Sequence, residues 1–105
     1  MIEPSESNEF NLDGDDELYV LRLFVAGASS NSVRAITNIK QVCETYLAGR
    51  YSLEIIDVHQ QKQVARQEQV IALPLLIKYL PLPQRRLIGD MSDTKQVLNG
   101  LGILV

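Results

Sequence analysis

The sequence contains one cysteine, Cys43, one histidine, His59, and no tryptophan. A structural zinc site takes about four cysteine or histidine ligands, so these two residues cannot form one. A lone cysteine also excludes a disulfide within the chain. We therefore expect a domain that folds around a hydrophobic core without a metal ion or a cofactor.

Long apolar runs are also missing. No stretch approaches the roughly 20 apolar residues of a membrane-spanning helix, and the first residues lack the basic and then apolar layout of a secretion signal. The 105 residues are 46% apolar and 22% charged, which is typical of one globular domain. These features predict a cytoplasmic protein with no membrane partner.

Basic side chains are absent from the first 17 residues, which have a formal charge of −7, whereas the remaining 88 residues have a charge of +4. We predict an acidic disordered tail at 1–17 and a folded domain at 18–105, because the tail has too few apolar groups to offset its ordering entropy. Phe10 and Leu12 leave open a transient contact of the tail with the domain or a partner. The weak basic charge predicts no nucleic-acid binding. The acidic residues of the tail are Glu3, Glu6, Glu9, Asp13, Asp15, Asp16 and Glu17.

The first half of the predicted domain has a strand, helix, strand pattern. Residues 18–25 are nearly all apolar, as in a strand that is covered on both faces. A serine or asparagine at 29–31 caps the following helix, Gly49 ends it, and a second, parallel strand follows at 51–58. The helix carries one apolar stripe, formed by Val33, Ile36, Ile39, Val42, Cys43, Tyr46 and Leu47.

The second half is less regular. Residues 59–69 are rich in glutamine and poor in apolar side chains, which predicts a weakly anchored helix at the sheet edge. A third strand is expected at 74–80, beginning at Pro74 because proline cannot donate to a strand ladder. Pro81 and Pro83 end this strand, and residues 84–88 return as its hairpin partner.

Residues 92–105 favour two structures about equally. Asp93 and Gln96 resemble a capping box, and the apolar residues at 97, 98 and 101 share a helical face. Against a helix, Gly100 and Gly102 each cost about 1 kcal/mol relative to alanine, and residues 103–105 favour a strand. Such a balance is what a fold switch needs.

This order of elements predicts an α/β, thioredoxin-like single domain with the order βαβαββα. Thioredoxins place a reactive Cys-x-x-Cys at the turn into the first helix, where the helix N-terminus lowers the thiol pKa. The corresponding turn here, residues 26–32, contains no sulfur, which excludes dithiol redox chemistry. Cys43 lies on the apolar stripe and is expected to be a small buried hydrophobe.

Other catalytic interpretations are weaker. The serines of this turn could activate a thiol, as in glutathione transferases, but capping explains them and the helical second domain of those enzymes is missing. His59 has no aspartate or serine at triad-like spacing and is interpreted as a solvated loop residue. We therefore predict no enzymatic activity.

Three arginines are candidates for binding. Arg34 lies in the first turn of its helix, where a cation faces the positive end of the dipole, so a partner carboxylate would explain it. Arg85 and Arg86 point to opposite faces of a strand, and one of them is expected to pair internally with Asp90 or Asp57. Ordinary salt bridging remains an equal alternative for all three arginines.

The block of residues 71–90 resembles the signature of the KaiB family. It has an apolar strand entered through Pro74, a Pro-x-Pro break, an Arg-Arg strand and a Gly-Asp turn. Further similar segments are YVLRLFVAG at 19–27, NSVRA at 31–35 and IDV at 56–58. The resemblance extends from Tyr19 to about Leu101.

The resemblance implies a small adaptor that binds the ATP-hydrolysing ring of a KaiC-type protein, captures a KaiA-like protein and displaces a sensor histidine kinase. It also implies homo-oligomers, dimers or tetramers, with the alternative order βαββααβ in a ground-state tetramer and a thioredoxin-like partner-bound monomer. Carried over by position, the partner-binding residues are Tyr19, Arg34, Lys78, Arg85 and Arg86. In the same way, Pro74 is an isomerisation candidate, and Gly100 and Gly102 lie in the switching segment.

Several positions depart from the pattern of clock members of the family, and they indicate a divergent relative. A role in stress or signalling control through a KaiC-like ATPase is therefore as plausible as a role in timing. The second hypothesis is a thioredoxin-like sensor or interaction domain of a two-component or stress-response pathway. The departures are Glu54, Leu73, Leu75, Leu82, Gly102 and the acidic segment at the N-terminus.

Overall fold

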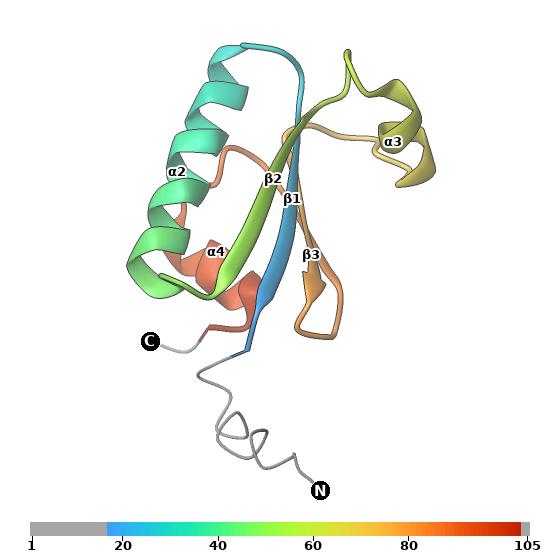
Figure 1. The fold of residues 1–105 in the computed structure, drawn as a ribbon. Coiled ribbons are helices and arrows are strands. Elements are labelled where there is room, and N and C mark those ends of the chain that lie inside the picture. The colour runs from blue at the N-terminus through green and yellow to red at the C-terminus, as the bar shows by residue number, and fades with distance from the viewer. Residues whose placement is uncertain (1–16, 104–105) are drawn as a thin grey trace, which may run out of the picture.

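The computed structural model describes residues 17–103. Its strands are β1 (Tyr19–Val25), β2 (Tyr51–Asp57), β3 (Leu75–Leu80) and β4 (Arg85–Ile88), and its helices are α2 (Ser30–Tyr46), α3 (Lys62–Gln67) and α4 (Thr94–Leu101). The chain order is βαβαββα, so the predicted α/β order is confirmed, and the alternative order βαββααβ is not the one adopted (Figure 1). The predicted acidic tail lies outside the described residues, apart from Glu17.

The four strands form one sheet in the order β2-β1-β3-β4. β1 and β2 run parallel, with Tyr19 opposite Tyr51 and Val25 opposite Asp57, because α2 returns the chain to the end of the sheet at which β1 starts. β3 is antiparallel to β1, and β3 and β4 form the predicted hairpin. As a result, the first residues of β1 and β2 and the β3–β4 connection lie at the same end of the sheet (Figure 1).

The larger part of the core lies on the face that α2 and α4 cover (Figure 1). Leu21, Leu23 and Leu76 of the sheet belong to the same buried cluster as Ile39 of α2 and Leu101 of α4. Fully burying one aliphatic side chain contributes about 1.5–3 kcal/mol, so this cluster dominates the stability of the domain.

Val33 departs from the predicted apolar stripe of α2, because its side chain is 50% exposed. At about 100° per residue, Val33 lies roughly 120° around the helix from Ile39, whereas Ser32 and Ala35 lie within about 40° of it. Ser32 and Ala35 are buried in its place. The prediction that Val33 is a core residue was wrong, since the register of the helix outweighs the hydrophobicity of one residue.

The opposite face of the sheet has a smaller core of Phe24, Ile56, Leu75 and Ile77. Val64 of α3 and Val70 beyond it pack against this cluster, so the helix covers a face of the sheet instead of its edge as predicted. α3 has six residues and none of them is buried. It is shorter than the predicted 59–69, and its start has no side-chain cap.

Of the two structures expected for residues 92–105, the helix is the one observed, and it extends to Leu101. Residues 104 and 105 lie outside the described part. Asp93 caps the helix by accepting a hydrogen bond from the backbone N–H of Gln96 at 3.1 Å. Gly102 ends it in the left-handed conformation, with φ of 79°, which glycine adopts without the steric penalty of a side chain. The glycine that argued against a helix therefore provides its C-cap.

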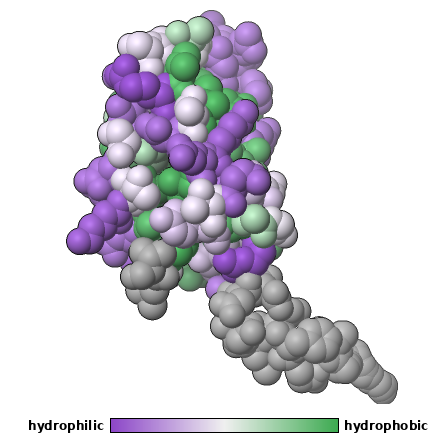
Figure 2. Space-filling model, turned by 90° about the vertical axis from the view of Figure 1, so that its left-hand side faces the viewer, coloured by the Kyte–Doolittle hydropathy of each residue, from purple (hydrophilic) through white to green (hydrophobic). Residues whose placement is uncertain are grey.

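The surface over α2 is mostly polar, with apolar side chains in an interrupted strip (Figure 2). Within residues 17–103, no helix combines the length and the hydrophobicity needed to cross a membrane.

Candidate functional site

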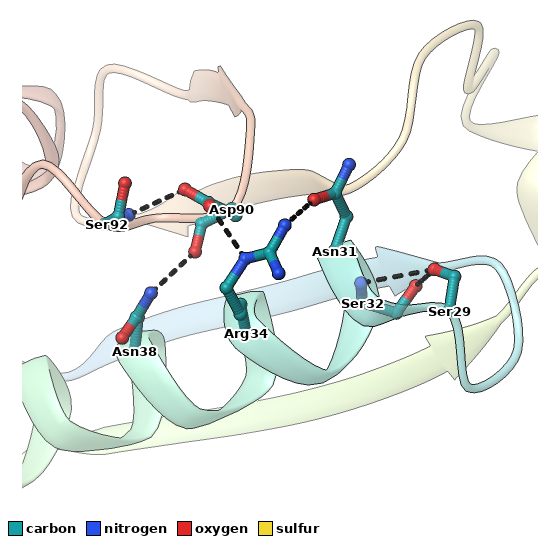
Figure 3. A network of polar contacts seen from close by, with 7 residues as sticks. All are labelled: Ser29, Asn31, Ser32, Arg34, Asn38, Asp90 and Ser92. Carbon is teal, nitrogen blue, oxygen red and sulfur yellow. Dashed lines mark hydrogen bonds and ion pairs between the residues drawn. The ribbon is translucent and has the colours of Figure 1, made fainter.

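The turn between β1 and α2 is the position of the reactive dithiol in thioredoxins, and here it is built from serine hydroxyls. Ser29 accepts a hydrogen bond from the backbone N–H of Ser32 at 3.2 Å and so caps α2 (Figure 3). The Ser29 hydroxyl also donates to Ser32 Oγ at 2.8 Å, and Ser32 Oγ accepts from the N–H of Ala26 at 3.1 Å. The predicted cap is confirmed, and these hydroxyls hold the turn together.

Asp57 closes the turn from the end of β2. One of its carboxylate oxygens accepts hydrogen bonds from the N–H of Gly27 at 3.2 Å and the N–H of His59 at 2.9 Å. His59 itself is exposed. In the described part of the chain, no group of three histidine, cysteine or acidic side chains is placed to hold a metal ion.

Cys43 lies away from this turn, on the buried face of α2. Its side chain is fully buried, and burial, assisted by the charge of Glu44, raises the pKa of the thiol to about 12. The thiolate is the reactive form of cysteine, so this residue is chemically protected. The prediction that Cys43 is a small core hydrophobe is confirmed.

The residues predicted to bind a partner fall into three places. Tyr19, Lys78 and Arg85 lie at the end of the sheet where β1 begins. Lys78 is paired with Leu21 on one side and with Arg85 on the other, so their side chains share the face that carries α4. Arg50 joins this group, because its carbonyl accepts the N–H of Tyr19 at 2.8 Å. We call Arg50, Lys78 and Arg85 the basic end.

Lys78 is a buried cation, with only 4% of the residue exposed. Its ammonium group donates to the carbonyl of Leu101 at 3.4 Å, at the C-terminal end of α4, where the helix dipole favours a positive charge. Desolvation, followed by the charge of Arg85, lowers the pKa of Lys78, while Glu17 acts in the opposite direction. Lys78 therefore lies in the core, bonds the last turn of α4 and is close enough to Arg85 for the two charges to repel each other.

Arg34 belongs to a second place, the contact of α2 with the loop between β4 and α4. Its Nε donates to Asp90 Oδ2 at 3.1 Å, and its guanidinium group also contacts Asn31 (Figure 3). Asn38 donates to the carbonyl oxygen of Asp90 at 2.9 Å. Hydrogen bonds from Ser92, and then from Arg34, lower the pKa of the Asp90 carboxyl. We call this network the Asp90 clamp.

Arg86 lies in the third place, on the face of the sheet covered by α3. It donates to the carbonyl of Glu68 at 2.6 Å and is 3.9 Å from the Glu68 carboxylate. Arg22 lies 3.9 Å from the same carboxylate. One of the two strand arginines, Arg86, pairs within the domain as predicted, but the expected partners Asp90 and Asp57 were wrong, because Asp90 bonds Arg34 and Asp57 bonds backbone amides.

The three predicted switch residues lie around the hairpin and α4. Pro74 is buried directly before β3, its preceding peptide bond is cis, and its carbonyl accepts the N–H of Gly89 at 3.0 Å. Gly100 faces β4, where a Cβ atom would come within 2.4 Å of the Leu87 side chain. At Gly102 a Cβ atom would lie 3.8 Å from Lys78 Nζ.

Sequence reasoning missed Arg50, Asn38 and Glu68. Arg50 follows a helix in a polar loop, and only the parallel pairing of β1 and β2 brings it beside Tyr19. Glu68 lies in the glutamine-rich segment, which carries no periodic signal. The spacing of Asn38 four residues after Arg34, on one side of α2, was the one usable clue.

The fold and the sulfur-free turn define a class, namely thioredoxin-fold proteins without a redox dithiol. The Drosophila melanogaster thioredoxin Deadhead superimposes with a TM-score of 0.67 at 15% identity, covering 96% of this chain and 94% of that chain, which shows the shared fold. The chain belongs to the KaiB family, whose domain model matches residues 22–103.

Two further comparisons support this assignment. The circadian clock oscillator protein KaiB of Synechococcus elongatus is 48% identical over 86 residues, which cover 82% of this chain and 84% of the relative. The solution structure of the N-terminal domain of Synechococcus elongatus SasA has a TM-score of 0.67 and 27% identity, covering 81% of this chain and 80% of that chain.

Proposed function

We propose that the protein is a non-enzymatic KaiB-type adaptor that binds a KaiC-type ATPase ring and regulates its output, in a circadian clock or in signalling derived from one. The observation that carries the proposal is the match of residues 22–103 to the KaiB domain, together with relatives that are named circadian clock oscillator proteins. Because several positions differ from the clock members of the family, the same adaptor could act either in timing or in stress signalling.

The geometry supports binding over catalysis. Ser29 and Ser32 use their hydroxyls to hold the turn that carries the dithiol in thioredoxins, and Cys43 is protected in the core. The accessible features are instead Arg85 of the basic end and apolar side chains near it. Leu80 and Leu82, which are 45% and 74% exposed, lie at the same end of the sheet as Arg85, because β3 ends at Leu80 and β4 begins at Arg85. Exposed apolar groups beside a cation are typical of a protein-binding surface.

The first test is binding to a cognate KaiC-type ring with ATP, ADP or no nucleotide, measured as co-elution in size-exclusion chromatography. We expect a complex with the parent chain, and about tenfold weaker binding for Arg85→Glu because the reversed charge repels the partner surface. Arg66→Glu is the matched control, since Arg66 is an exposed arginine on α3. A chain that forms no complex in any nucleotide state would contradict the proposal.

A second candidate is a thioredoxin-like sensor or interaction domain, and the likeness to the SasA domain favours it. If both proteins use one kind of surface, this chain should compete with a SasA-type domain of a sensor histidine kinase for the ring. A pull-down with the ring, the kinase domain and increasing amounts of this chain measures the competition. Simultaneous binding of both would contradict a shared surface and so count against the second candidate. A KaiA-like protein can be added to the adaptor complex to test its capture.

We also propose that the segment from Pro74 to Gly102 rearranges between the βαβαββα fold and an oligomeric fold of order βαββααβ. Its support is the near balance of helix and strand preference after Ser92, where two glycines accompany a capped helix. Gly102 serves the helix as its C-cap, whereas Gly100 weakens it, so small changes here shift the balance.

A further inference from the structure

The basic end surrounds the point at which the acidic N-terminal segment joins the fold. The segment connects through Leu18 to Tyr19, the first residue of β1. Burial and then the charge of Glu17, its last residue, raise the pKa of Tyr19, while Arg50 acts in the opposite direction. Desolvation and the charge of Arg85 lower the pKa of Lys78, and Glu17 opposes this shift. Arg50 directly before β2, Lys78 in β3 and Arg85 in β4 thus lie at the end of the sheet where β1 begins.

Among the described residues, no carboxylate lies within ion-pair distance of these cations. Within residues 17–103, the side-chain ion pairs closer than 4.0 Å use Arg22, Arg34 and Arg86, and the members of the basic end form none. Residues 1–16 carry six acidic side chains and no basic one. The charge of this segment is therefore complementary to the part of the domain that it adjoins.

The N-terminal segment and this end of the sheet also both carry apolar side chains. Leu18 is 53% exposed, and Leu80 and Leu82 are exposed on the β3–β4 connection at the same end of the sheet, because Leu80 pairs with Val20 of β1. The acidic segment contains Phe10 and Leu12 among its polar residues. A mixed surface of leucines and cations suits a segment that contains both acidic side chains and a few apolar ones.

From these observations we infer that the N-terminal segment, residues 1–16, docks on the basic end of its own chain, with its carboxylates on Arg50 and Arg85 and its apolar residues on Leu80 and Leu82. Sixteen residues span up to about 50 Å when extended, so the surface is well within reach. The covalent link makes the encounter intramolecular, with an effective concentration in the millimolar range for a short linker. Weak contacts therefore suffice for docking.

Docking has a consequence that rests on the proposed function. The segment covers Arg85 and the exposed leucines, which are the groups that we propose face the ATPase ring. A partner surface has to displace the segment before it binds, so the segment acts as a built-in competitor. The occupancy of the basic end then depends on ionic strength and on any modification of the charges at 1–16.

Paramagnetic relaxation on the full chain tests the docking without any partner. A spin label is attached to Ser7→Cys under native conditions, and the parent chain, with Cys43 alone, serves as the labelling control. We expect strong broadening of the amide signals of Arg50, Lys78, Leu82 and Arg85 and little broadening in α3 (Lys62–Gln67). The broadening should fall between 0.1 M and 1 M salt, where the screening length drops from about 10 Å to about 3 Å.

Two charge variants make the test specific. Replacing the six acidic residues of 1–16 by their amides should abolish the selective broadening, and Arg85→Gln should weaken it at least twofold, while Arg66→Gln leaves it unchanged. Equal broadening in α3 and at the basic end would overturn the inference. So would broadening in a mixture of spin-labelled chain and isotope-labelled, label-free chain, because it would place the contact between two copies.

The ring assay separates this inference from the proposed function. If both hold, the amide variant of 1–16 should bind a KaiC-type ring severalfold more tightly than the parent at low salt. If the ring does not bind at all, the relaxation data still decide whether the segment docks. If the relaxation data show no docking, ring binding by the parent chain is unaffected and the proposed function stands.

Discussion

At the scale of a single residue, the buried charge of Lys78 lowers the stability of the fold. Its ammonium group is buried beside Leu101 with one long hydrogen bond, so desolvation is poorly compensated. We expect Lys78→Met, which keeps the aliphatic stem, to raise the free energy of unfolding by about 1 kcal/mol at pH 7 and to weaken binding to a KaiC-type ring. Urea unfolding and the co-elution assay measure the two effects.

The pH dependence of the Lys78→Met effect checks its cause. The folded-state pKa of Lys78 is lowered, so the parent chain gains stability as the pH rises through that pKa toward the unfolded value near 10.4. The advantage of Lys78→Met should therefore shrink at high pH. Lys62→Met, at an exposed position, is the control. A variant as unstable as a cavity mutant would show that the amine is required by the fold.

Cys43 gives a second prediction at the residue scale. Burial raises its pKa to about 12, so the thiolate is scarce at neutral pH and the thiol should react with an aromatic disulfide reagent only after unfolding. Equal labelling rates in buffer and in urea would contradict this. The sign for stability follows from the same shift: the folded state holds the proton more tightly, so stability should fall as the pH rises above about 8.5.

At the scale of elements, α4 depends on how closely Gly100 approaches β4. Helix propensity alone predicts that Gly100→Ala favours the helical state of residues 94–101 by about 1 kcal/mol. The new methyl group, however, would lie 2.4 Å from Leu87 Cδ2, so the side chain of Leu87 has to move. We expect the gain in the parent to be smaller than in a Leu87→Ala background, with a coupling of about 1 kcal/mol.

Urea unfolding of the four proteins of this cycle gives the coupling, and amide spectra report the state of residues 94–101. Additivity within about 0.3 kcal/mol would mean that the helix and β4 do not constrain each other. Because β4 has only four residues, Leu87 is one of its few anchors to the core. The close approach of Gly100 and Leu87 therefore links the packing of α4 to that of the hairpin.

The sequence predicted most elements because their signals are local. Each of the strands β1 to β4 begins and ends within one or two residues of its predicted range, since apolar runs and prolines mark them. The capping roles of Ser29 and Asp93 were also predictable from residue type and spacing. Thioredoxin-like order and the absence of a reactive thiol followed from the same local patterns.

The partners of charged side chains were not predictable, because they depend on tertiary contacts. Arg34 meets Asp90 across 56 residues, and Arg86 meets Glu68 through the path of an irregular segment. The five predicted binding residues also separate into three places, since β4 sends Arg85 and Arg86 to opposite faces. The alternation of side chains along a strand predicts that Arg85 and Arg86 lie on opposite faces, but it does not predict which residue each of them contacts.

At the scale of the whole molecule, the Asp90 clamp ties the two halves of the chain together. It joins α2 to the loop before α4 through the hydrogen bonds of Arg34 and Asn38 to Asp90. We expect Asp90→Asn to shift the population toward larger oligomers, because the clamp loses its charge. Size-exclusion chromatography with light scattering, at several concentrations, measures the shift.

Glu54→Gln is the matched control for the clamp, since it breaks the exposed Arg22–Glu54 pair within β1 and β2. An identical oligomer distribution for Asp90→Asn and the parent would show that the clamp does not select the fold. The pKa of Asp90 is lowered, so its contribution to stability is present above about pH 4 and is lost as the pH falls through the folded-state value. Acid should therefore act on the parent more than on Asp90→Asn.

The two faces of the sheet also differ in how firmly they are covered. α2 has 17 residues and five buried side chains, whereas α3 has six residues and none buried. In hydrogen exchange, the amides of α3 should therefore open without global unfolding, while those of β1 and α2 exchange only with it. The segment 59–72, which contains α3, is in consequence the natural place to insert a fluorescent reporter, because an insertion there leaves both the Asp90 clamp and the basic end free to form their contacts.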